Sequence, residues 1–235
     1  MKQLIKKLYY KFRVVTTNKA SVVLMLHSIN AKNSDTGKVN LSRDRFTELM
    51  DVVNQFEHIG DVVIKGASGV ALSFDDGRSD IYSDIYPYLK SRQIPFTIFV
   101  TYNLLDTAGY LTKQQLIELA DDELVTIGSH CMNHVPLAQQ AKEVQYTEII
   151  ESKKMLEELL QKPVEYMAYP YGQHNEDTFK IIKDNDAYKY AFRAGGLFLE
   201  KKEKSRYALA RMNMSNRYYE QNINILKDMK KRMEK

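Results

Sequence analysis

The sequence predicts an α/β fold built on a mostly parallel sheet. Short apolar runs rich in β-branched and aromatic residues alternate along the chain of 235 residues with longer segments of helical period, and this alternation is typical of parallel strands joined by helices. Several of the apolar runs end in clustered polar residues, as strands of α/β folds do at an active site. Seven or eight strands in this length suit either a barrel or a doubly wound sheet.

The strand candidates are short runs of four to six residues dominated by apolar side chains, at 21–26, 70–74, 95–100, 125–129, 165–169, 189–193 and 207–212, with a weaker one at 61–64. The helix candidates repeat apolar residues at a spacing of three or four, at 42–56, 79–91, 112–121, 141–160, 175–184 and 217–234. Thr112 and Gln115 have the spacing of a capping box at the start of the third helix.

Composition limits the class of protein. Hydrophobic residues make up 44% and charged residues 27% of the chain, as in soluble globular proteins. The net charge of +4 is mild and does not indicate binding to nucleic acid. The single cysteine, Cys131, excludes an internal disulfide, and we expect it to be a small buried residue.

The chain divides into a basic amphipathic N-terminal segment, 1–19, and one domain, 20–235. Leu4, Ile5 and Leu8 fall at helical spacing with lysines between them. These lysines interrupt any signal-peptide core, and no run of about 18 apolar residues predicts a membrane span. We therefore expect a cytoplasmic protein, with the inner membrane face as a further location. The segment can be a helix packed on the domain, a membrane-surface helix formed by residues 1–16, or a partner-binding helix.

Two histidines have the spacing of metal ligands. His130 and His134 are four residues apart after the strand candidate 125–129, so both imidazoles can reach one ion from one helical turn. A carboxylate from another strand end would complete a set of two nitrogens and one oxygen, which leaves positions open as in a catalytic zinc site. The alternative is that these are ordinary histidines. Three of the five histidines, counting His27, directly follow apolar runs, which favours the metal site.

Two adjacent acids follow the strand candidate 70–74. Paired carboxylates after a buried strand are costly unless a cation compensates them, and Gly77 supplies the tight turn behind Asp75 and Asp76. One carboxylate can bind the metal while the other accepts a proton from water. An isolated Asp-Asp-Gly sequence is often a plain turn. It indicates a metal site here only in combination with the two histidines.

Three motifs together resemble the polysaccharide deacetylase family (NodB-homology domain, carbohydrate esterase family 4). They are Ser-Phe-Asp-Asp-Gly at 73–77, His-x-x-x-His at 130–134 and Ala-Tyr-Pro-Tyr-Gly at 168–172, and the resemblance covers about residues 20–215. It implies a distorted (β/α) barrel of about seven parallel strands. It also implies a divalent ion, Zn²⁺ first, held by Asp76, His130 and His134, with Asp75 as the general base. Co²⁺, Ni²⁺ or Fe²⁺ would also accept these ligands.

The third motif implies a substrate groove wall formed by Pro170, Tyr171 and Gly172, with the backbone N–H of Tyr171 assisting the oxyanion. Many family members carry an arginine where this chain has Ala168, and that arginine pairs with the base. Asp75 therefore needs another partner, for which Arg193 and Arg211 are the candidates near late strand ends.

The general acid is also displaced in this sequence. The family's late Leu-x-His motif is missing, since residues 209–213 read Leu-Ala-Arg-Met-Asn. Instead, Leu-Met-Leu-His-Ser at 24–28 resembles the poly-N-acetylglucosamine deacetylase branch, whose barrel is circularly permuted. This resemblance implies a permuted barrel with His27 as the acid. The alternative is a buried structural histidine, and His174 is a further loop histidine that can contact either substrate or solvent.

The function implied is metal-dependent removal of N-acetyl groups from an amino-sugar glycan or glycan precursor. An O-acetyl esterase on carbohydrate would use the same metal and base, but an amide needs protonation of its leaving group more, so His27 favours the amide. A third alternative is an inactive glycan-binding homologue. Such a protein usually loses a metal ligand or the base, whereas Asp75, Asp76, His130 and His134 are all present.

The basic N-terminal segment yields a test of membrane contact. A variant lacking residues 1–16 should bind vesicles of anionic lipid more weakly than the full chain, because it loses the lysines and the apolar positions between them. Vesicle co-sedimentation measures this, with hydrolysis of a soluble oligomer as the control that the domain is intact. Equal binding by both proteins would reject the membrane-surface interpretation.

Overall fold

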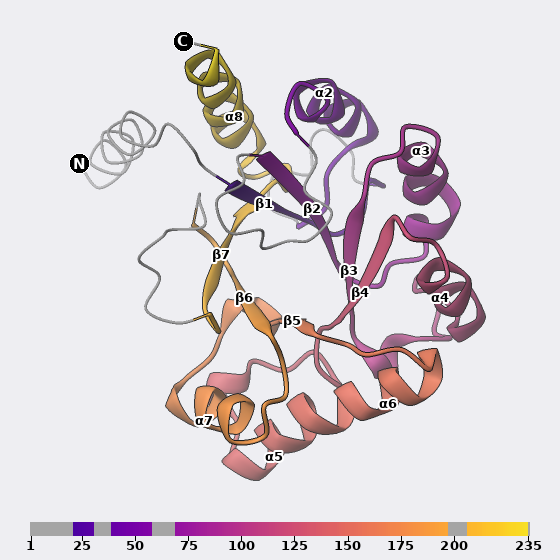
Figure 1. Ribbon diagram of the computed structural model, residues 1–235, viewed down its shortest axis with the longest axis vertical. Helices are drawn as coiled ribbons and strands as arrows, with labels where there is room; N and C mark the ends of the chain where they lie inside the picture. The colour runs from indigo at the N-terminus through magenta and orange to yellow at the C-terminus, as the bar shows by residue number, and fades with distance from the viewer. Residues whose placement is uncertain (1–20, 31–38, 58–68, 197–205, 235) are drawn as a thin grey trace.

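The computed structural model describes residues 21–30, 39–57, 69–196 and 206–234 (Figure 1). The expected N-terminal segment 1–19 and the weak strand candidate 61–64 lie outside these residues. Seven parallel strands close into a barrel in the order β1 to β7, which confirms the expected fold class. The strands are β1 Ser21–Leu26, β2 Gly69–Asp76, β3 Phe96–Val100, β4 Val125–Ser129, β5 Tyr166–Ala168, β6 Tyr190–Ala194 and β7 Leu209–Asn213.

Helices surround the barrel, and they are α2 Arg43–Val53, α3 Tyr86–Lys90, α4 Lys113–Ala120, α5 Lys142–Tyr146, α6 Ser152–Leu160, α7 Glu176–Asp184 and α8 Tyr219–Met233. The expected helices 79–91 and 141–160 each contain a π-helical turn, at Ile81–Ile85 and Thr147–Glu151. The capping box of Thr112 and Gln115 is confirmed at the start of α4. No helix of the described residues is long and apolar enough to cross a membrane.

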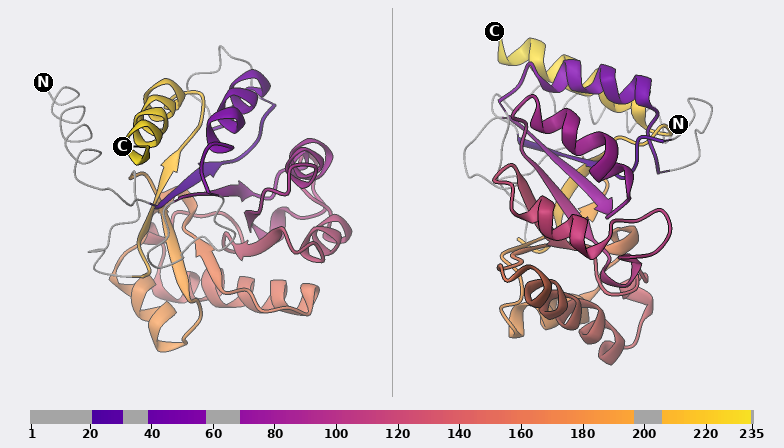
Figure 2. Two further views of the ribbon diagram at one scale, coloured as in Figure 1. Left: turned by 45° about the horizontal axis from the view of Figure 1, so that its top comes forward. Right: turned by 90° about the vertical axis from the view of Figure 1, so that its right-hand side faces the viewer.

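The barrel closes where the last strand meets the first. β1 pairs with β2 along its whole length and with β7 through Leu24 opposite Met212. The two helices outside this seam, α2 and α8, lie side by side (Figure 2) and are joined by the Arg45–Glu220 ion pair. The strand bearing His27 therefore neighbours the late strand, as expected. Circular permutation stays a prediction, because a closed ring has the same neighbours whichever strand comes first.

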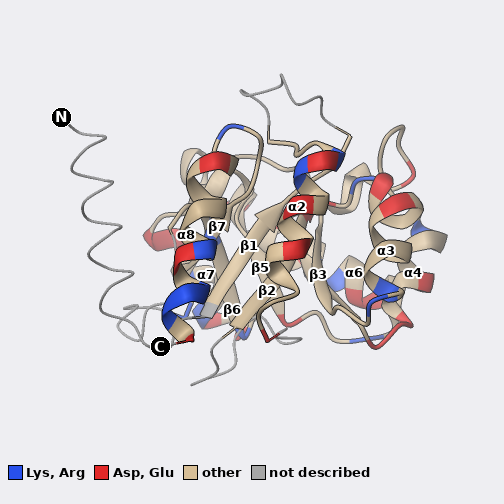
Figure 3. Cartoon of the chain, turned by 90° about the horizontal axis from the view of Figure 1, so that it is seen from above, with Lys and Arg blue, Asp and Glu red and all other residues tan. Residues whose placement is uncertain are grey.

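Apolar side chains form two layers on the strands. One layer lies between the strands and the helices and includes Leu24 and Leu72, whereas the other lies inside the ring and includes Val23, Ala71 and Phe99. Charged residues lie mainly on the outer helices, and the strands carry few of them (Figure 3). Because side chains alternate along a strand, every second residue after an inner one also points into the barrel.

This alternation carries polar residues into the barrel at the carboxyl ends of the strands. Counting in twos from Val23 on β1 gives His27, and counting from Ala71 on β2 gives Asp75. Leu209, another inner residue, likewise leads to Arg211 on β7. Parallel strands end at the same edge, so these side chains meet above the inner apolar layer.

Gly128 on β4 makes room for that inner layer. A Cβ atom on Gly128 would stand 2.6 Å from two ring carbons of Phe99 and 3.0 Å from the carbonyl oxygen of Tyr166. Gly128→Ala should therefore lower the free energy of unfolding by about 1–3 kcal/mol, measured by urea denaturation. Adding Phe99→Leu should recover part of this loss, and additive losses in the double variant would contradict the proposed clash.

Candidate metal centre and active site

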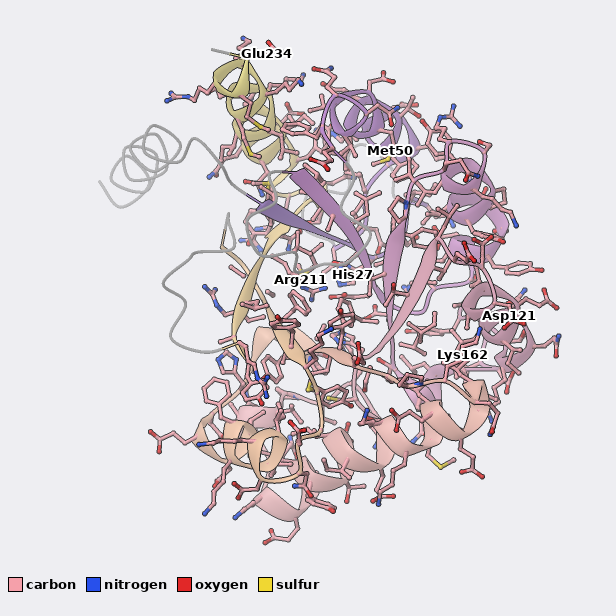
Figure 4. All side chains as sticks on the ribbon, in the orientation of Figure 1. His27, Met50, Asp121, Lys162, Arg211 and Glu234 are labelled. Atoms are coloured by element: carbon pink, nitrogen blue, oxygen red, sulfur yellow. The ribbon has the colours of Figure 1, made fainter. Side chains whose placement is uncertain are left out.

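Polar residues from several strand ends meet at one edge of the barrel. His27 directly follows β1, Asp75 and Asp76 end β2, and His130 directly follows β4. Arg211 lies within β7, and Figure 4 shows it near His27 in the middle of the ring of strands. The convergence expected from the sequence is thus present.

Three of these residues form a compact cluster of possible metal ligands. The carboxylate atom Oδ1 of Asp76 lies 3.3 Å from Nε2 of His134 and 3.7 Å from Nε2 of His130. One ligand atom from each residue can be chosen so that all lie within 4.8 Å of one another. This spacing allows one ion to contact all three side chains.

The two histidines do not share a helical turn, and that expectation was wrong. Residues 130–136 lie outside any helix. The loop turns back because Cys131 and His134 adopt positive φ angles of 67° and 58°. Asp76 and Tyr171 also have positive φ angles, of 74° and 57°. Each such position costs a non-glycine residue roughly 1–2 kcal/mol, so the surrounding structure holds strained backbone at this site.

The donor atoms fit a divalent cation. Nδ1 of His130 lies 2.7 Å from the carbonyl oxygen of Ala168 and donates a proton to it, which leaves Nε2 free to bind a metal. Burial lowers the pKa of His130 to about 4, so the imidazole is neutral as a ligand must be. Burial opposes the charge of Asp76, but the neighbouring histidines hold its pKa below its usual range. Its Oδ1 is buried without a hydrogen-bond partner among the described residues.

The carboxylate of Asp75 on β2 is bound by Arg211, which lies on β7 across the seam. Arg211 donates from Nη1 to Oδ1 of Asp75 at 2.6 Å and from Nη2 to Oδ2 at 2.7 Å. Asp75 is 2% exposed and Arg211 fully buried. Burial opposes the charge of Asp75, yet the Arg211 charge holds its pKa below the usual range. The carboxylate is therefore ionised at neutral pH, and its Oδ2 lies 4.0 Å from Nε2 of His130.

Arg193, the other candidate partner, is not at this site. Its guanidinium donates to the carbonyl oxygens of Ala208 and Gly195. It has no hydrogen bond or ion pair with Asp75, although both residues are described. The physical reason is the alternation along the strands. Phe192 belongs to the inner layer, so its neighbour Arg193 on β6 points out of the barrel, whereas Arg211 lies two positions after the inner residue Leu209 and points into it.

His27 lies in the same space as the metal cluster. Its side chain is 8% exposed, and its Nδ1 is buried without a partner in the described chain. Burial lowers the pKa of His27, although the charges of Asp75 and Asp76 favour protonation. His27 makes no ion pair with either acid at contact distance in the described structure, so it borders the cluster without belonging to it.

Asp80 is a residue of this region that the sequence did not single out. Its Oδ2 accepts hydrogen bonds from Ser28 Oγ and from the backbone N–H of Ile29, both at 2.8 Å. It thereby ties the turn after His27 to the segment that follows β2. The acid lies more than 50 positions from its partners in the chain, so no local pattern signals this contact.

The third motif borders the cluster. The ring of Tyr171 lies 4.7 Å from that of His134, and Tyr171 is 63% exposed. Pro170 is buried, and Gly172 approaches the next strand so closely that a Cβ atom would stand 2.7 Å from the backbone nitrogen of Ala194. The motif is thus fixed at both sides and presents Tyr171 to solvent beside the metal ligands.

Two further residues have structural contacts. Cys131 is fully buried, as expected, and burial raises the pKa of its thiol well above its usual value. His174 packs on Tyr169, with ring centroids 4.8 Å apart, and its Nδ1 lies 3.1 Å from the carbonyl oxygen of Gly172. His174 therefore supports the third motif through its contacts with Tyr169 and Gly172.

Comparison with known sequences places this site in a family. The family model described as polysaccharide deacetylase matches residues 64–190, which is more than half of the chain. A protein of Bacillus subtilis named as a polysaccharide deacetylase, YxkH, is 32% identical over 114 residues, covering 48% of this chain and 40% of that protein. The poly-beta-1,6-N-acetyl-D-glucosamine N-deacetylase of Staphylococcus epidermidis is 30% identical over 129 residues, covering 49% of this chain and 45% of that protein. The chain thus matches less than half the length of these relatives.

Solved structures share the fold. The deacetylase PplD of Streptococcus pyogenes superposes with a TM-score of 0.71 at 24% identity, covering 91% of this chain and 99% of that one. IcaB from Ammonifex degensii superposes with a TM-score of 0.74 at 19% identity, covering 90% and 97%. At these identities the likeness shows the barrel alone. With the match over residues 64–190, the chain belongs to the polysaccharide deacetylase family.

Proposed function

We propose that this protein is a metal-dependent hydrolase that removes N-acetyl groups from an amino-sugar glycan or glycan precursor. The observation that carries the proposal is the cluster of Asp76, His130 and His134 beside the buried pair of Asp75 and Arg211. Hydrolysis of an unactivated amide needs an electrophile, a base and a source of protons, and this arrangement offers candidates for each. The staphylococcal relatives named as N-deacetylases support the choice of substrate.

Asp76, His130 and His134 would hold the ion, with Zn²⁺ proposed first because two imidazoles and a carboxylate are typical of catalytic zinc sites. The ion, when bound, would polarise the acyl oxygen and acidify water. An ion held there would also satisfy the buried Oδ1 of Asp76, which has no hydrogen-bond partner among the described residues. The hydrogen bond from His130 to Ala168 keeps one imidazole in the tautomer that binds metal.

Asp75 is proposed as the general base. It is ionised and lies next to the metal ligands, since its Oδ2 is 4.0 Å from His130 Nε2. Arg211 occupies one lone-pair direction on each oxygen and fixes the orientation of the carboxylate. The remaining lone pairs can accept a proton from a water molecule at the cluster.

Tyr171 is proposed to support the developing oxyanion. Its backbone N–H makes no hydrogen bond within the described chain, while the N–H groups of Gly172 and Gln173 bond the turn itself. The positive φ of Tyr171 turns this N–H out of the backbone ladder. A preorganised donor of this kind contributes about 3–4 kcal/mol to transition-state stabilisation.

The separation of metal ligand and base gives the first test. His134→Ala should lose the bound ion and hydrolysis, because one of three ligands is removed. Asp75→Asn should keep the ion but lose activity by about 10²–10⁴-fold, because the amide cannot accept the proton. Metal content by elemental analysis and acetate release from N-acetylglucosamine oligomers measure both. Loss of metal in Asp75→Asn with retention in His134→Ala would reverse the two assignments.

His27 is proposed to transfer a proton to the departing amine, from the seam side of the cleft. His27→Ala should slow amide hydrolysis by about 10²–10⁴-fold. It should slow hydrolysis of an activated aryl ester clearly less, because that leaving group needs no proton. Steady-state rates on both substrates test this, with unchanged metal content as the control. Equal losses on amide and ester would leave the acid unassigned.

A further inference from the structure

The loop that carries the two histidine ligands has almost no structure of its own. Residues 130–136 form no helix, and Cys131 and His134 have positive φ angles. A ligand loop without an internal hydrogen-bond ladder must be held by contacts from other segments. Otherwise the two imidazoles would not stay positioned to bind the same ion. The contacts that hold the loop come from two directions.

From one side, the loop carbonyls accept bonds from the chain after β3. The N–H of Tyr102 donates to the carbonyl oxygen of Cys131 at 3.2 Å, and the N–H of Asn103 donates to that of Met132 at 3.0 Å. The side chain of Asn103 adds a bond of 2.7 Å to Oδ1 of Asn133. These bonds fix the outer edge of the loop, but they leave its N–H groups to be satisfied elsewhere.

From the other side, a single buried carboxylate takes two of those N–H groups. Oε2 of Glu148 accepts from the backbone N–H of Met132 at 3.0 Å and of Asn133 at 2.9 Å. Oε1 of the same group accepts from Nδ2 of Asn133 at 2.7 Å. Both oxygens act only as acceptors, so the three donors match a carboxylate. Glu148 is 2% exposed.

The backbone that carries Glu148 is itself irregular. Glu148 lies in the π-helical turn Thr147–Glu151 between α5 and α6, and such turns occur frequently at functional sites. Ser152, the first residue of α6 directly after this turn, bonds Ser129, whose Oγ accepts from the N–H of Cys131. Glu148 of this turn thus accepts from two of the three backbone N–H groups between the two histidines, and Ser129, bonded to Ser152, accepts from the third.

We propose that Glu148 is a positioning residue that sets the metal affinity of the site by holding the loop between His130 and His134. The inference rests on the proposed metal site and extends it to a residue that contacts neither ion nor substrate. Loss of outer-shell partners of metal ligands typically weakens metal binding by about 10–100-fold. Glu148→Gln should produce a loss of this size. With its oxygen on the two backbone N–H groups, the new amide would place its own N–H group against the side-chain Nδ2–H of Asn133.

The acid and the amide can be exchanged between positions 148 and 133. This exchange separates the effect of loop geometry on metal affinity from a general loss of stability. In the double variant Glu148→Gln, Asn133→Asp, the Gln amide would donate to the new carboxylate while its oxygen still accepts both backbone N–H groups. The double variant keeps the net charge, and its Zn²⁺ affinity should return toward that of the wild type. Asn133→Asp alone should weaken binding, since two carboxylates would then face each other.

Zn²⁺ is titrated into the metal-free proteins against a chromophoric chelator, and thermal unfolding is followed in EDTA. Glu157→Gln is the matched control, because Glu157 accepts from the N–H of Val164 at 2.8 Å but lies on α6 away from the loop. It should change thermal stability without changing Zn²⁺ affinity. If Glu148→Gln does not fold, the single Asn133→Asp variant and the double variant still decide the question.

The outcomes are distinct. Unchanged affinity in Glu148→Gln, or a double variant no better than the worse single one, would overturn the positioning role while leaving the metal site intact. Tighter binding by Asn133→Asp alone would show that charge near the ion, not loop geometry, governs affinity, and would also overturn it. A wild-type protein that binds no Zn²⁺ at His134 would refute the proposed function itself, and the inference with it.

Discussion

The buried ion pair of Asp75 and Arg211 is the interaction around which the site is organised. Alternation along β2 turns Asp75 into the closed barrel, where an unpaired carboxylate would be costly. Arg211, turned inward from β7 by the same alternation, supplies two hydrogen bonds of 2.6 Å and 2.7 Å. Removing one partner of such a pair leaves a buried charge and typically costs about 3–5 kcal/mol. The pair therefore constrains two strands that are not neighbours in the ring.

Other contacts extend this constraint to the strand between them. Ser73 Oγ donates to the carbonyl oxygen of Leu24 on β1 at 2.8 Å and accepts from Arg211 at 3.1 Å. The guanidinium carbon of Arg211 stands 5.0 Å from the centroid of the Phe99 ring, which forms the floor below it. β1, β2 and β7 are thus linked at the level where the polar residues begin. His27 emerges from the middle strand of the three, so its position follows from this link.

The two adjacent aspartates have different environments, which suits different roles. Asp75 continues the alternation of β2 and has both oxygens bonded by Arg211. Asp76 breaks the alternation with a φ of 74° and keeps Oδ1 directed at two imidazoles. Neighbouring carboxylates that are separated in this way can bind metal and accept protons independently. A regular strand would have placed the second carboxylate outside the barrel, among apolar side chains.

The sequence by itself determined the alternation of strands and helices, the Thr112 capping box and the residues that gather at the strand ends, because these depend on local periodicity and short motifs. It could not choose between Arg193 and Arg211, since which arginine reaches Asp75 depends on which face of each strand points into the closed barrel. It also placed His130 and His134 on a helical turn, whereas tertiary contacts hold them on a strained loop. Asp80 and Glu148 gave no signal, because their partners lie far away in the chain or on backbone groups. Only the closed barrel decided these contacts, by bringing distant segments together at one edge.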